Sequence, residues 1–230
     1  MRDVVETITF LNKKGGVGKT SLATNLAGAI AVQDESKRVL LIDGDIETNS
    51  ALNWHMRRDP SRPALGFDVV SQRSAHLSAG TGKYNFFIID TKAAPKEQDL
   101  IQTVEGSQLI IVPTLPDAGS LATTYETIES IRALTPNCMH KVRVLINSIM
   151  VQARTQNMDI VAAFDNAGIK CFDAYMNCYR NAYHPASGDG LLVQELSNEQ
   201  ARKAWAQCQA MSREILELLA SLHMEEVVHG

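Results

Sequence analysis

Short apolar runs alternate with segments of helical periodicity along this chain. The predicted strands lie at 6–11, 38–43, 67–70, 84–90, 108–113, 142–147 and 169–175, and helical patterns lie at 19–32, 100–104, 119–134, 158–167 and 198–222. Several strand segments, such as "RVLLID" and "QLIIVP", are nearly continuously apolar, which is typical of strands covered on both faces in a parallel sheet. Segments 55–66 and 184–190 are predicted loops because they are rich in Pro, Gly and Ser. The alternation predicts an α/β fold with a doubly wound, mostly parallel, twisted sheet flanked by helices.

Composition narrows the class of protein. The 230 residues fit one domain spanning 1–230, and the net charge of −4 means that any contact with DNA needs a local patch of Lys and Arg. The four cysteines form no C-x-x-C pair and no metal-ligand spacing, so they are expected to be reduced. The N-terminus "MRDVVET" lacks the apolar core of a signal peptide, and no apolar run approaches the ~20 residues of a membrane span. We therefore expect a cytoplasmic protein.

The stretch "NKKGGVGKTS" (12–21) lies between the first predicted strand and the first predicted helix. Its glycines let the backbone bend so that N–H groups point at phosphate oxygens, and the helix that follows adds its positive end. This context is that of the phosphate-binding loop of a P-loop NTPase. Lys19 is expected to reach the β- and γ-phosphates, and Thr20 to offer its hydroxyl to Mg²⁺. The predicted nucleotide-binding residues of the loop are Lys14, Gly15, Gly16, Val17, Gly18, Lys19, Thr20 and Ser21.

A second lysine distinguishes this loop from the usual G-x-x-x-x-G-K-[ST] pattern. Lys13 stands where the first glycine is expected, and Lys14 follows inside the loop. Phosphoryl transfer builds negative charge on the γ-phosphate, and a cation from a neighbouring subunit can stabilise that charge. We therefore predict that Lys14 acts catalytically across a dimer. The alternative is an ordinary solvent-exposed lysine.

Acidic side chains follow two of the predicted strands. Asp43 and Asp45 lie at the end of the run "RVLLID" and just beyond it, and Asp90 closes "YNFFIID" in the Walker B form. Ligands collect at the carboxyl ends of the strands in an open parallel sheet. Carboxylates placed there can hold water on Mg²⁺ or orient the attacking water. The sequence therefore predicts a metal site formed by Thr20, Asp43, Asp45 and Asp90, although a D-x-D pair after a strand is often only a capped turn.

The segment "KKGGVGKT" resembles the deviant Walker A motif, K-G-G-x-x-G-K-[ST], of the ParA/MinD ATPases. The resemblance spans most of the chain, from Ile8 to about Leu222. It implies ATP and Mg²⁺ as cofactors and an ATP-dependent sandwich homodimer, in which Lys14 is the signature lysine acting in the partner's site. Asp45 matches the second Asp of the family's D-x-D-P-Q-x-N segment, which orients the hydrolytic water. The catalytic residues implied by the resemblance are Lys14, Lys19 and Asp45.

Two further segments match the family, while three positions depart from it. Asn147 ends "VLIN", where family members set an asparagine amide against adenine, and "RNAYHPASGDG" aligns Pro185 with a family loop near the base and the dimer interface. Ile46 and Glu47 stand where the family commonly has Pro and Gln, and Lys92 replaces the first Pro of D-T-P-P. These departures leave open the rate of hydrolysis and the way in which the segments that follow Asp45 and Asp90 respond to it.

The resemblance also implies a class of function. ParA-type proteins drive partition or positioning of a plasmid, chromosome or other cargo on the nucleoid, with nonspecific DNA binding and a ParB-like or other adaptor protein that stimulates hydrolysis. MinD-type proteins bind membrane through a basic amphipathic helix, which the acidic end "HMEEVVHG" disfavours. Candidate DNA contacts are Arg202, Lys203 and Arg213, with Lys170 and Arg180 favoured less and a solvated helix face as the alternative.

Two alternative functions stay open at this point. One is a regulatory switch that docks on a protein complex or membrane instead of DNA. The other is a small-molecule enzyme with a related P-loop. The second is disfavoured because the sequence has no acid or base cluster beyond the nucleotide residues and because Lys14 would have no role.

Overall fold

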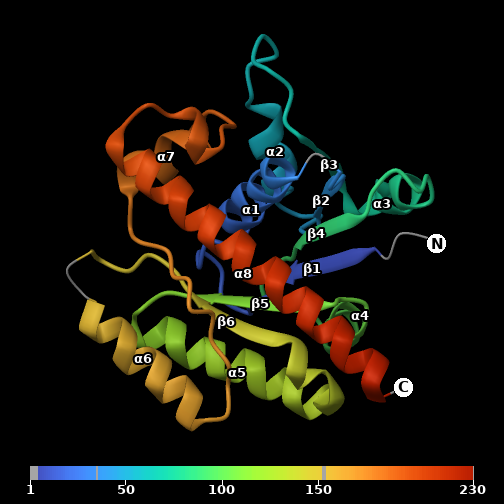
Figure 1. Cartoon of the computed structure of the whole chain (residues 1–230), viewed down its shortest axis with the longest axis vertical. Helices are drawn as coiled ribbons and strands as arrows, with labels where there is room; N and C mark the ends of the chain where they lie inside the picture. The colour runs from blue at the N-terminus through green and yellow to red at the C-terminus, as the bar shows by residue number, and fades with distance from the viewer. Residues whose placement is uncertain (1–4, 35, 152–153, 230) are drawn as a thin grey trace.

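The computed structural model describes residues 5–34, 36–151 and 154–229, and its centre is a parallel sheet with strand order β3-β2-β4-β1-β5-β6 (Figure 1). Strand β1 pairs with β4 on one side and β5 on the other, so the chain adds strands first toward β3 and later toward β6. This is the doubly wound arrangement, and the predicted fold class is confirmed. The strands are β1 (Glu6–Phe10), β2 (Val39–Asp43), β3 (Phe67–Ser71), β4 (Phe86–Asp90), β5 (Leu109–Thr114) and β6 (Val142–Ile146).

Helices cover both faces of the sheet. One buried cluster joins α1, α2, α7 and α8 to one face, and α8 crosses in front of α1 in Figure 1. A second cluster joins α4, α5 and α6 to the opposite face. The helices are α1 (Lys19–Gln33), α2 (Ser50–Met56), α3 (Gln72–Ala79), α4 (Glu97–Glu105), α5 (Ala118–Leu134), α6 (Arg154–Asn166), α7 (Arg180–Gly188) and α8 (Glu199–His229), with short 3₁₀ turns η1 (Pro136–Lys141) and η2 (Val193–Glu195).

The strand predicted at 169–175 is wrong. This segment runs beside β6 but shares only a single bridge with it, between Val144 and Cys171. The N–H groups of Asp173 and Ala174 donate to the Glu214 carboxylate on α8, at 2.7 and 2.8 Å, and not to a strand. A side chain from the helical layer therefore satisfies backbone groups that a ladder would otherwise have used.

The loop predicted at 184–190 is also wrong for most of its length, because α7 continues to Gly188. Pro185 lies inside this helix and cannot donate to the carbonyl of Asn181. The side chain of Asn198 donates to that carbonyl instead, at 3.0 Å. Helices α2 and α3 were not predicted, since they span only seven and eight residues and show too few turns to reveal a helical period. The last helix extends to His229, beyond the predicted end at 222.

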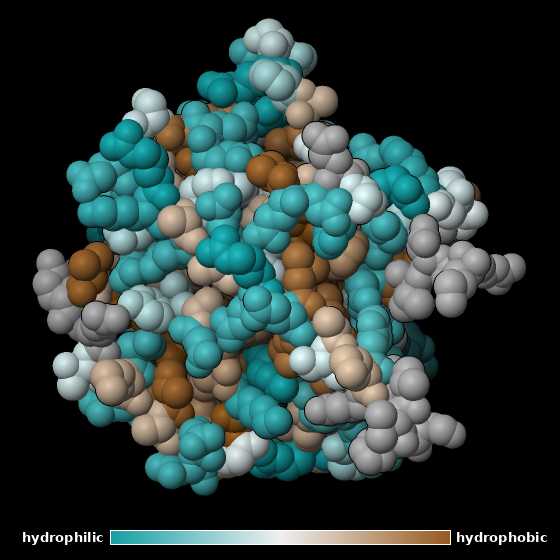
Figure 2. All heavy atoms as spheres, in the orientation of Figure 1, coloured by the Kyte–Doolittle hydropathy of each residue, from teal (hydrophilic) through white to brown (hydrophobic). Residues whose placement is uncertain are grey.

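The surface over α7 and α8 is mainly hydrophilic. Figure 2, drawn in the orientation of Figure 1, shows hydrophobic side chains there in small separate groups. Within the described ranges, every helix is too short or too polar to cross a bilayer.

Candidate functional site

The loop between β1 and α1 curls around the amine of Lys19. Gly16 and Gly18 have φ values of 77° and 94°, a left-handed conformation that favours glycine. Lys19 Nζ donates to the carbonyls of Asn12 and Lys14, at 3.3 and 3.2 Å. Burial lowers the pKa of Lys19, while the charges of Asp90 and Asp45 act in the opposite direction. The loop thus holds the buried Lys19 amine in its concavity, where phosphate oxygens would compete with the two carbonyls for its hydrogen bonds.

Thr20 and Asp90 form a short hydrogen bond at the end of β4. Thr20 Oγ1 donates to Asp90 Oδ2 at 2.6 Å, and Asp90 is 1% exposed. The other carboxylate oxygen, Oδ1, is buried without a hydrogen-bond partner among the described residues. Burial raises the pKa of Asp90 to about 7. The hydrogen bond from Thr20 acts to lower this pKa, and the negative charge of Asp43 acts to raise it. A hydroxyl beside a carboxylate oxygen that lacks a donor fits Mg²⁺, which binds proteins through one or two carboxylates plus substrate phosphates.

The structure gives Asp43 and Asp45 different surroundings. Asp43 Oδ1 accepts from the N–H of Asp45 at 3.0 Å, and Oδ2 accepts from the N–H of Leu52 at 2.9 Å. This buried carboxylate therefore holds the start of α2 against β2, and it does not line the nucleotide cavity.

Asp45 does line that cavity. Its Oδ1 accepts from the N–H groups of Glu47 and Thr48, at 3.2 and 3.1 Å. Burial acts to raise the pKa of Asp45, but these hydrogen bonds and the charge of Lys19 outweigh it and lower the pKa. Asp45 is therefore ionised at neutral pH, as an acceptor for water must be.

Lys14 contacts the start of α5 in its own chain. Its Nζ donates to Ser120 Oγ at 2.8 Å and lies 3.4 Å from Asp117 Oδ1, and its side chain is 32% exposed. Asp117 is the N-cap of α5 and also accepts from the N–H of Ser120. The amine is therefore held by α5, and Lys14 is not among the residues that line the nucleotide cavity with Thr20 and Asp90. The action of Lys14 across a dimer stays a prediction.

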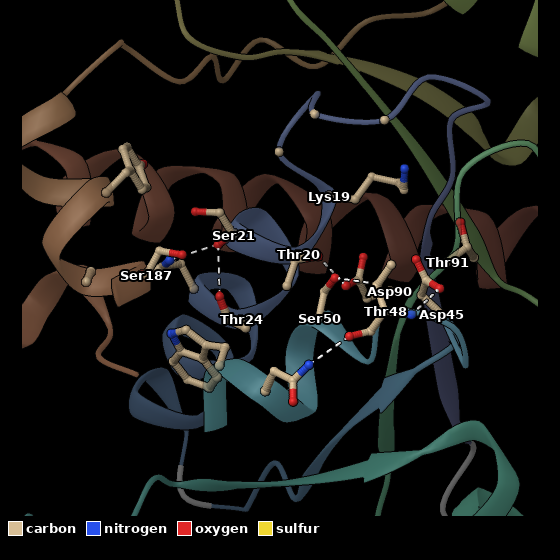
Figure 3. Close-up of a pocket in the computed structure, with 18 of the residues that line it drawn as sticks. Lys19, Thr20, Ser21, Thr24, Asp45, Thr48, Ser50, Asp90, Thr91 and Ser187 are labelled. Carbon is tan, nitrogen blue, oxygen red and sulfur yellow. Dashed lines mark hydrogen bonds between the residues drawn. The ribbon is translucent and has the colours of Figure 1, made fainter. Parts of the chain in front are cut away.

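Two adjoining cavities surround the loop. The first, of about 620 Å³, extends from Thr20, Asp45 and Asp90 along α2 to α7, so that in Figure 3 Asp90 and Ser187 lie at opposite sides. The second, of about 480 Å³, lies on the other side of Gly16 and Gly18. The sequence did not predict the wall that α2, the residues flanking it and α7 contribute to the first cavity. This wall consists of Thr48, Ser50, Asn53, Trp54, Arg57, Tyr183, Ala186 and Ser187.

Asn147 follows β6 directly and lines the second cavity. Its Nδ2 donates to the carbonyl of Val17 at 2.8 Å, and a Cβ on Gly18 would lie 2.4 Å from the same nitrogen. The predicted amide therefore contacts the loop at Val17 and Gly18, in a cavity that Ser21 also lines. Pro185 is exposed on α7 and lines neither cavity, so the structure does not bring it together with the other predicted residues.

The CobQ/CobB/MinD/ParA nucleotide binding domain family matches residues 8–192 of this chain. The chain belongs to this family. The Maintenance of carboxysome distribution protein A of Gloeobacter kilaueensis is 30% identical over 211 residues, which cover 90% of this chain and 93% of that protein. The chromosome partitioning protein ParA of Caulobacter vibrioides is 41% identical over 66 residues, 29% of this chain and 24% of that one.

Solved structures show the same fold as this ParA/MinD-family chain. The MinD cell division protein of Aquifex aeolicus superposes with a TM-score of 0.68 at 18% identity, covering 93% of this chain and 97% of that one. A variant of Cyanothece McdA in complex with ATP superposes with a TM-score of 0.66 at 16% identity, covering 92% and 96%. The family recognised from the loop motif is confirmed, and its members are ATPases.

The three favoured candidate DNA residues of this family member lie on α8, outside both cavities, whereas Arg180 begins α7 and lines the second cavity and Lys170 lies between α6 and α7. Arg202, Lys203 and Arg213 are exposed, and Lys203 pairs with Glu199 at 2.7 Å. Arg202 and Arg213 are eleven residues apart, so they project from the same side of the helix, about 16 Å apart along its axis. Contact with DNA stays a prediction.

Proposed function

We propose that this chain is an ATPase that binds ATP with Mg²⁺, closes into an ATP-dependent homodimer, and distributes or partitions a cargo along DNA. The observation that carries this proposal is the Thr20–Asp90 pair, with its uncompensated carboxylate oxygen, next to the loop that holds Lys19. Buried carboxylate oxygens are usually hydrogen-bonded, and a cation bound beside the Thr20 hydroxyl would supply the contact that Asp90 Oδ1 lacks.

Each residue of the site has a proposed task. Lys19 exchanges the carbonyls of Asn12 and Lys14 for phosphate oxygens, while Gly16 and Gly18 let the backbone approach them. Thr20 and Asp90 hold Mg²⁺, which when bound neutralises charge on the phosphate oxygens. The ionised carboxylate of Asp45 orients the attacking water. Asn147 faces the base in the second cavity.

Lys14 is proposed to act in the site of the second subunit. Its partly exposed amine is bound in its own chain by Ser120 and Asp117, and Lys14 does not line the cavity that contains Thr20 and Asp90. In a face-to-face dimer the same position fits an approach to the partner's phosphates, where a cation stabilises charge that develops in the transition state. Hydrolysis would then depend on dimerisation and on an adaptor protein of the ParB-like kind.

The proposed cargo is a large assembly, and the proposed DNA contact lies on α8. A relative that covers 90% of this chain is named for maintenance of carboxysome distribution, which supports positioning of a large cargo. Arg202 and Arg213, on one side of α8, are proposed to neutralise DNA phosphates from both subunits of the dimer. The protein would then be nucleoid-associated in the cytoplasm.

DNA binding measured with ATP, with ADP and without nucleotide tests this proposal. We expect salt-sensitive binding that appears only with ATP and Mg²⁺, and that is weakened in the double variant Arg202→Ala/Arg213→Ala. Arg132→Ala, on α5 at the opposite face of the sheet, is the matched control and should bind as the unaltered protein does. Binding that ignores nucleotide, or that depends on Arg132 as much as on α8, would refute the DNA contact.

A second candidate is a regulatory switch that docks on a protein complex without DNA. The observations that favour it are the net charge of −4 and the Glu199 carboxylate that already pairs with Lys203. MinD of Aquifex aeolicus, which shares the fold, has a structure in a MinC:MinD complex. ATP-dependent dimerisation without any DNA binding would select this alternative.

A further inference from the structure

A third concavity, of about 570 Å³, lies beside the nucleotide cavity at the carboxyl ends of β2 and β4. It opens between the segments that follow these two strands and the helices α3 and α4. Only Thr91 is shared with the nucleotide cavity. We name it the switch groove, and its lining residues are Gly44, Ile46, Glu47, Gln72, Ile89, Thr91, Lys92, Pro95, Asp99, Gln102 and Thr103.

The three departures from the family motifs meet in this groove. Ile46 and Glu47 follow β2, and Lys92 follows β4, yet all three line the same concavity. Ile46 and Lys92 place longer, more flexible side chains where the family motif has Pro, and Glu47 places a negative charge where the motif has the neutral Gln. Ile46 is 41% exposed and lies in the groove with the half-buried Ile89, which gives the groove an apolar floor. The departures therefore change one surface of the molecule together.

The charges at the groove favour a basic occupant. The exposed Glu47 carboxylate has no hydrogen bond or ion pair with any described residue. Lys92 and Asp99 pair loosely at 3.5 Å, with side chains 35% and 50% exposed. The groove thus carries two carboxylates, of Glu47 and Asp99, and one ammonium group, of Lys92. The unpaired charge is the negative charge of Glu47, which lies next to the apolar floor.

We propose that the switch groove binds a peptide segment of a partner protein, in which an apolar side chain is flanked by Lys or Arg. The apolar side chain would cover Ile46 and Ile89, and the basic one would pair with Glu47. This inference rests on the proposed function, because the partner is the protein that stimulates hydrolysis. A peptide bound in the groove would contact the segment after β2, which carries Asp45, and the segment after β4, which directly follows Asp90.

Backbone hydrogen bonds give such an occupant a direct route to the reaction. The N–H of Glu47 donates to Asp45 Oδ1 at 3.2 Å, so a shift of Glu47 moves an atom that orients the Asp45 carboxylate. The N–H of Gly44 donates to the carbonyl of Asp90 at 2.8 Å, which joins the two segments on either side of the groove. Binding in the groove is therefore expected to change the rate of hydrolysis more than the affinity for nucleotide.

Selection of a displayed library of random peptides on the full chain, with ATP and Mg²⁺, tests this inference. We expect the selected peptides to combine Lys or Arg with Leu, Ile, Val, Phe or Met, and to stimulate ATP hydrolysis when synthesised. Glu47→Lys, which reverses the charge, and Gln102→Trp, which fills the groove from an exposed position on α4, should each weaken peptide binding about tenfold or more. Glu105→Lys, at the far end of α4 and outside the groove, should bind like the unaltered chain.

Three results would overturn the proposal. These are failure to select any peptide, selection of acidic peptides, and equal binding to Glu47→Lys, Gln102→Trp and Glu105→Lys. Basal ATP hydrolysis of Gln102→Trp and Glu105→Lys, and thermal unfolding of all three variants, show whether the site and the fold are intact. Normal basal hydrolysis with no groove-dependent binding refutes only the switch groove, whereas an unaltered chain that hydrolyses no ATP refutes the proposed function itself.

Discussion

Removal of the Glu195 carboxylate is expected to destabilise the protein strongly. Arg58, which follows α2, donates two parallel hydrogen bonds to Glu195 in η2, each of 2.8 Å. The two side chains are only 9% and 17% exposed. Glu195 also accepts from the N–H of Leu192 at 2.9 Å. The pair therefore connects the end of α2 to the turn that leads into α8.

The magnitude for Glu195→Ala follows from these contacts. Loss of one partner from a buried ion pair costs about 3–5 kcal/mol, because the other charge stays behind without compensation. Arg58 keeps hydrogen bonds to the carbonyls of Pro63 and Gly190, at 2.7 and 3.3 Å, which places the expected cost near the lower limit, about 3 kcal/mol. For a chain of this length, that cost corresponds to a fall of about 6–12 °C in Tm.

Urea unfolding of Glu195→Ala, Arg58→Ala and the double variant measures this cost and the coupling between the two residues. Lys83→Ala is the matched control, since Lys83 and Asp68 pair at 2.6 Å with side chains 59% and 51% exposed. An exposed pair should cost about 1 kcal/mol or less. If Glu195→Ala and Lys83→Ala lose the same free energy of unfolding, the argument from burial is refuted.

The same pair predicts a dependence on pH. Burial acts to raise the pKa of Glu195, but the hydrogen bonds from Arg58 and Leu192 outweigh it, so the pKa is lower in the folded state than in the unfolded chain. The stabilisation is therefore complete above the unfolded-state pKa, about 4.3, and is lost as the pH falls through the folded-state value. The difference in unfolding free energy between the unaltered protein and Glu195→Gln should shrink in that acidic range and stay constant near pH 7.

Three further changes test the nucleotide site. Lys14→Ala should bind a fluorescent ATP analogue normally but lose partner-stimulated phosphate release, and unchanged release would contradict the action of Lys14 across a dimer. Asp45→Ala should trap an ATP-bound dimer, and a purely monomeric variant with ATP in size-exclusion chromatography would contradict the role of Asp45. Gly18→Ala should lower the unfolding free energy by about 1–3 kcal/mol, because its Cβ would lie 2.4 Å from Asn147 Nδ2 at a φ of 94°. Gly15→Ala should lower the unfolding free energy by less in the same urea titration, because nothing lies within 4 Å of its added Cβ.

The fold could be predicted where the sequence pattern reflects local geometry. Strands such as β2 and β5 are buried along their whole length, so their continuous apolar runs identify them directly. The error at 169–175 arises because Ile169 and Phe172 are buried in the core without belonging to a strand. An apolar pattern reports that side chains are buried, but it does not report which backbone groups pair.

The site could be predicted only in part for a similar reason. Motif spacing predicted Lys19, Thr20 and Asp90 as site residues, and the structure brings Thr20 into contact with Asp90 in a cavity that Lys19 also lines. The contacts of Lys14 with Asp117 and Ser120 join residues more than 100 positions apart, and no local pattern contains them. Asp43 was predicted as a metal ligand because it is a carboxylate at the end of a strand. In the structure both its oxygens accept backbone N–H groups, one at the start of α2 and one in the preceding loop.

Backbone and side-chain contacts form a continuous route from the nucleotide site to η2, the turn that precedes α8. A Cβ on Gly44 would lie 2.9 Å from the carbonyl of Asp90, so only glycine lets the segment after β2 lie this close to the end of β4. The Asp43 carboxylate then holds the start of α2, and Arg58, just past the end of that helix, holds Glu195. A displacement of the segment after β2 must therefore either move α2 or break a charge-assisted hydrogen bond worth about 1.5–3 kcal/mol. Because breaking such bonds is costly, we expect the segment, α2 and η2 to move together when nucleotide changes the surroundings of Asp90.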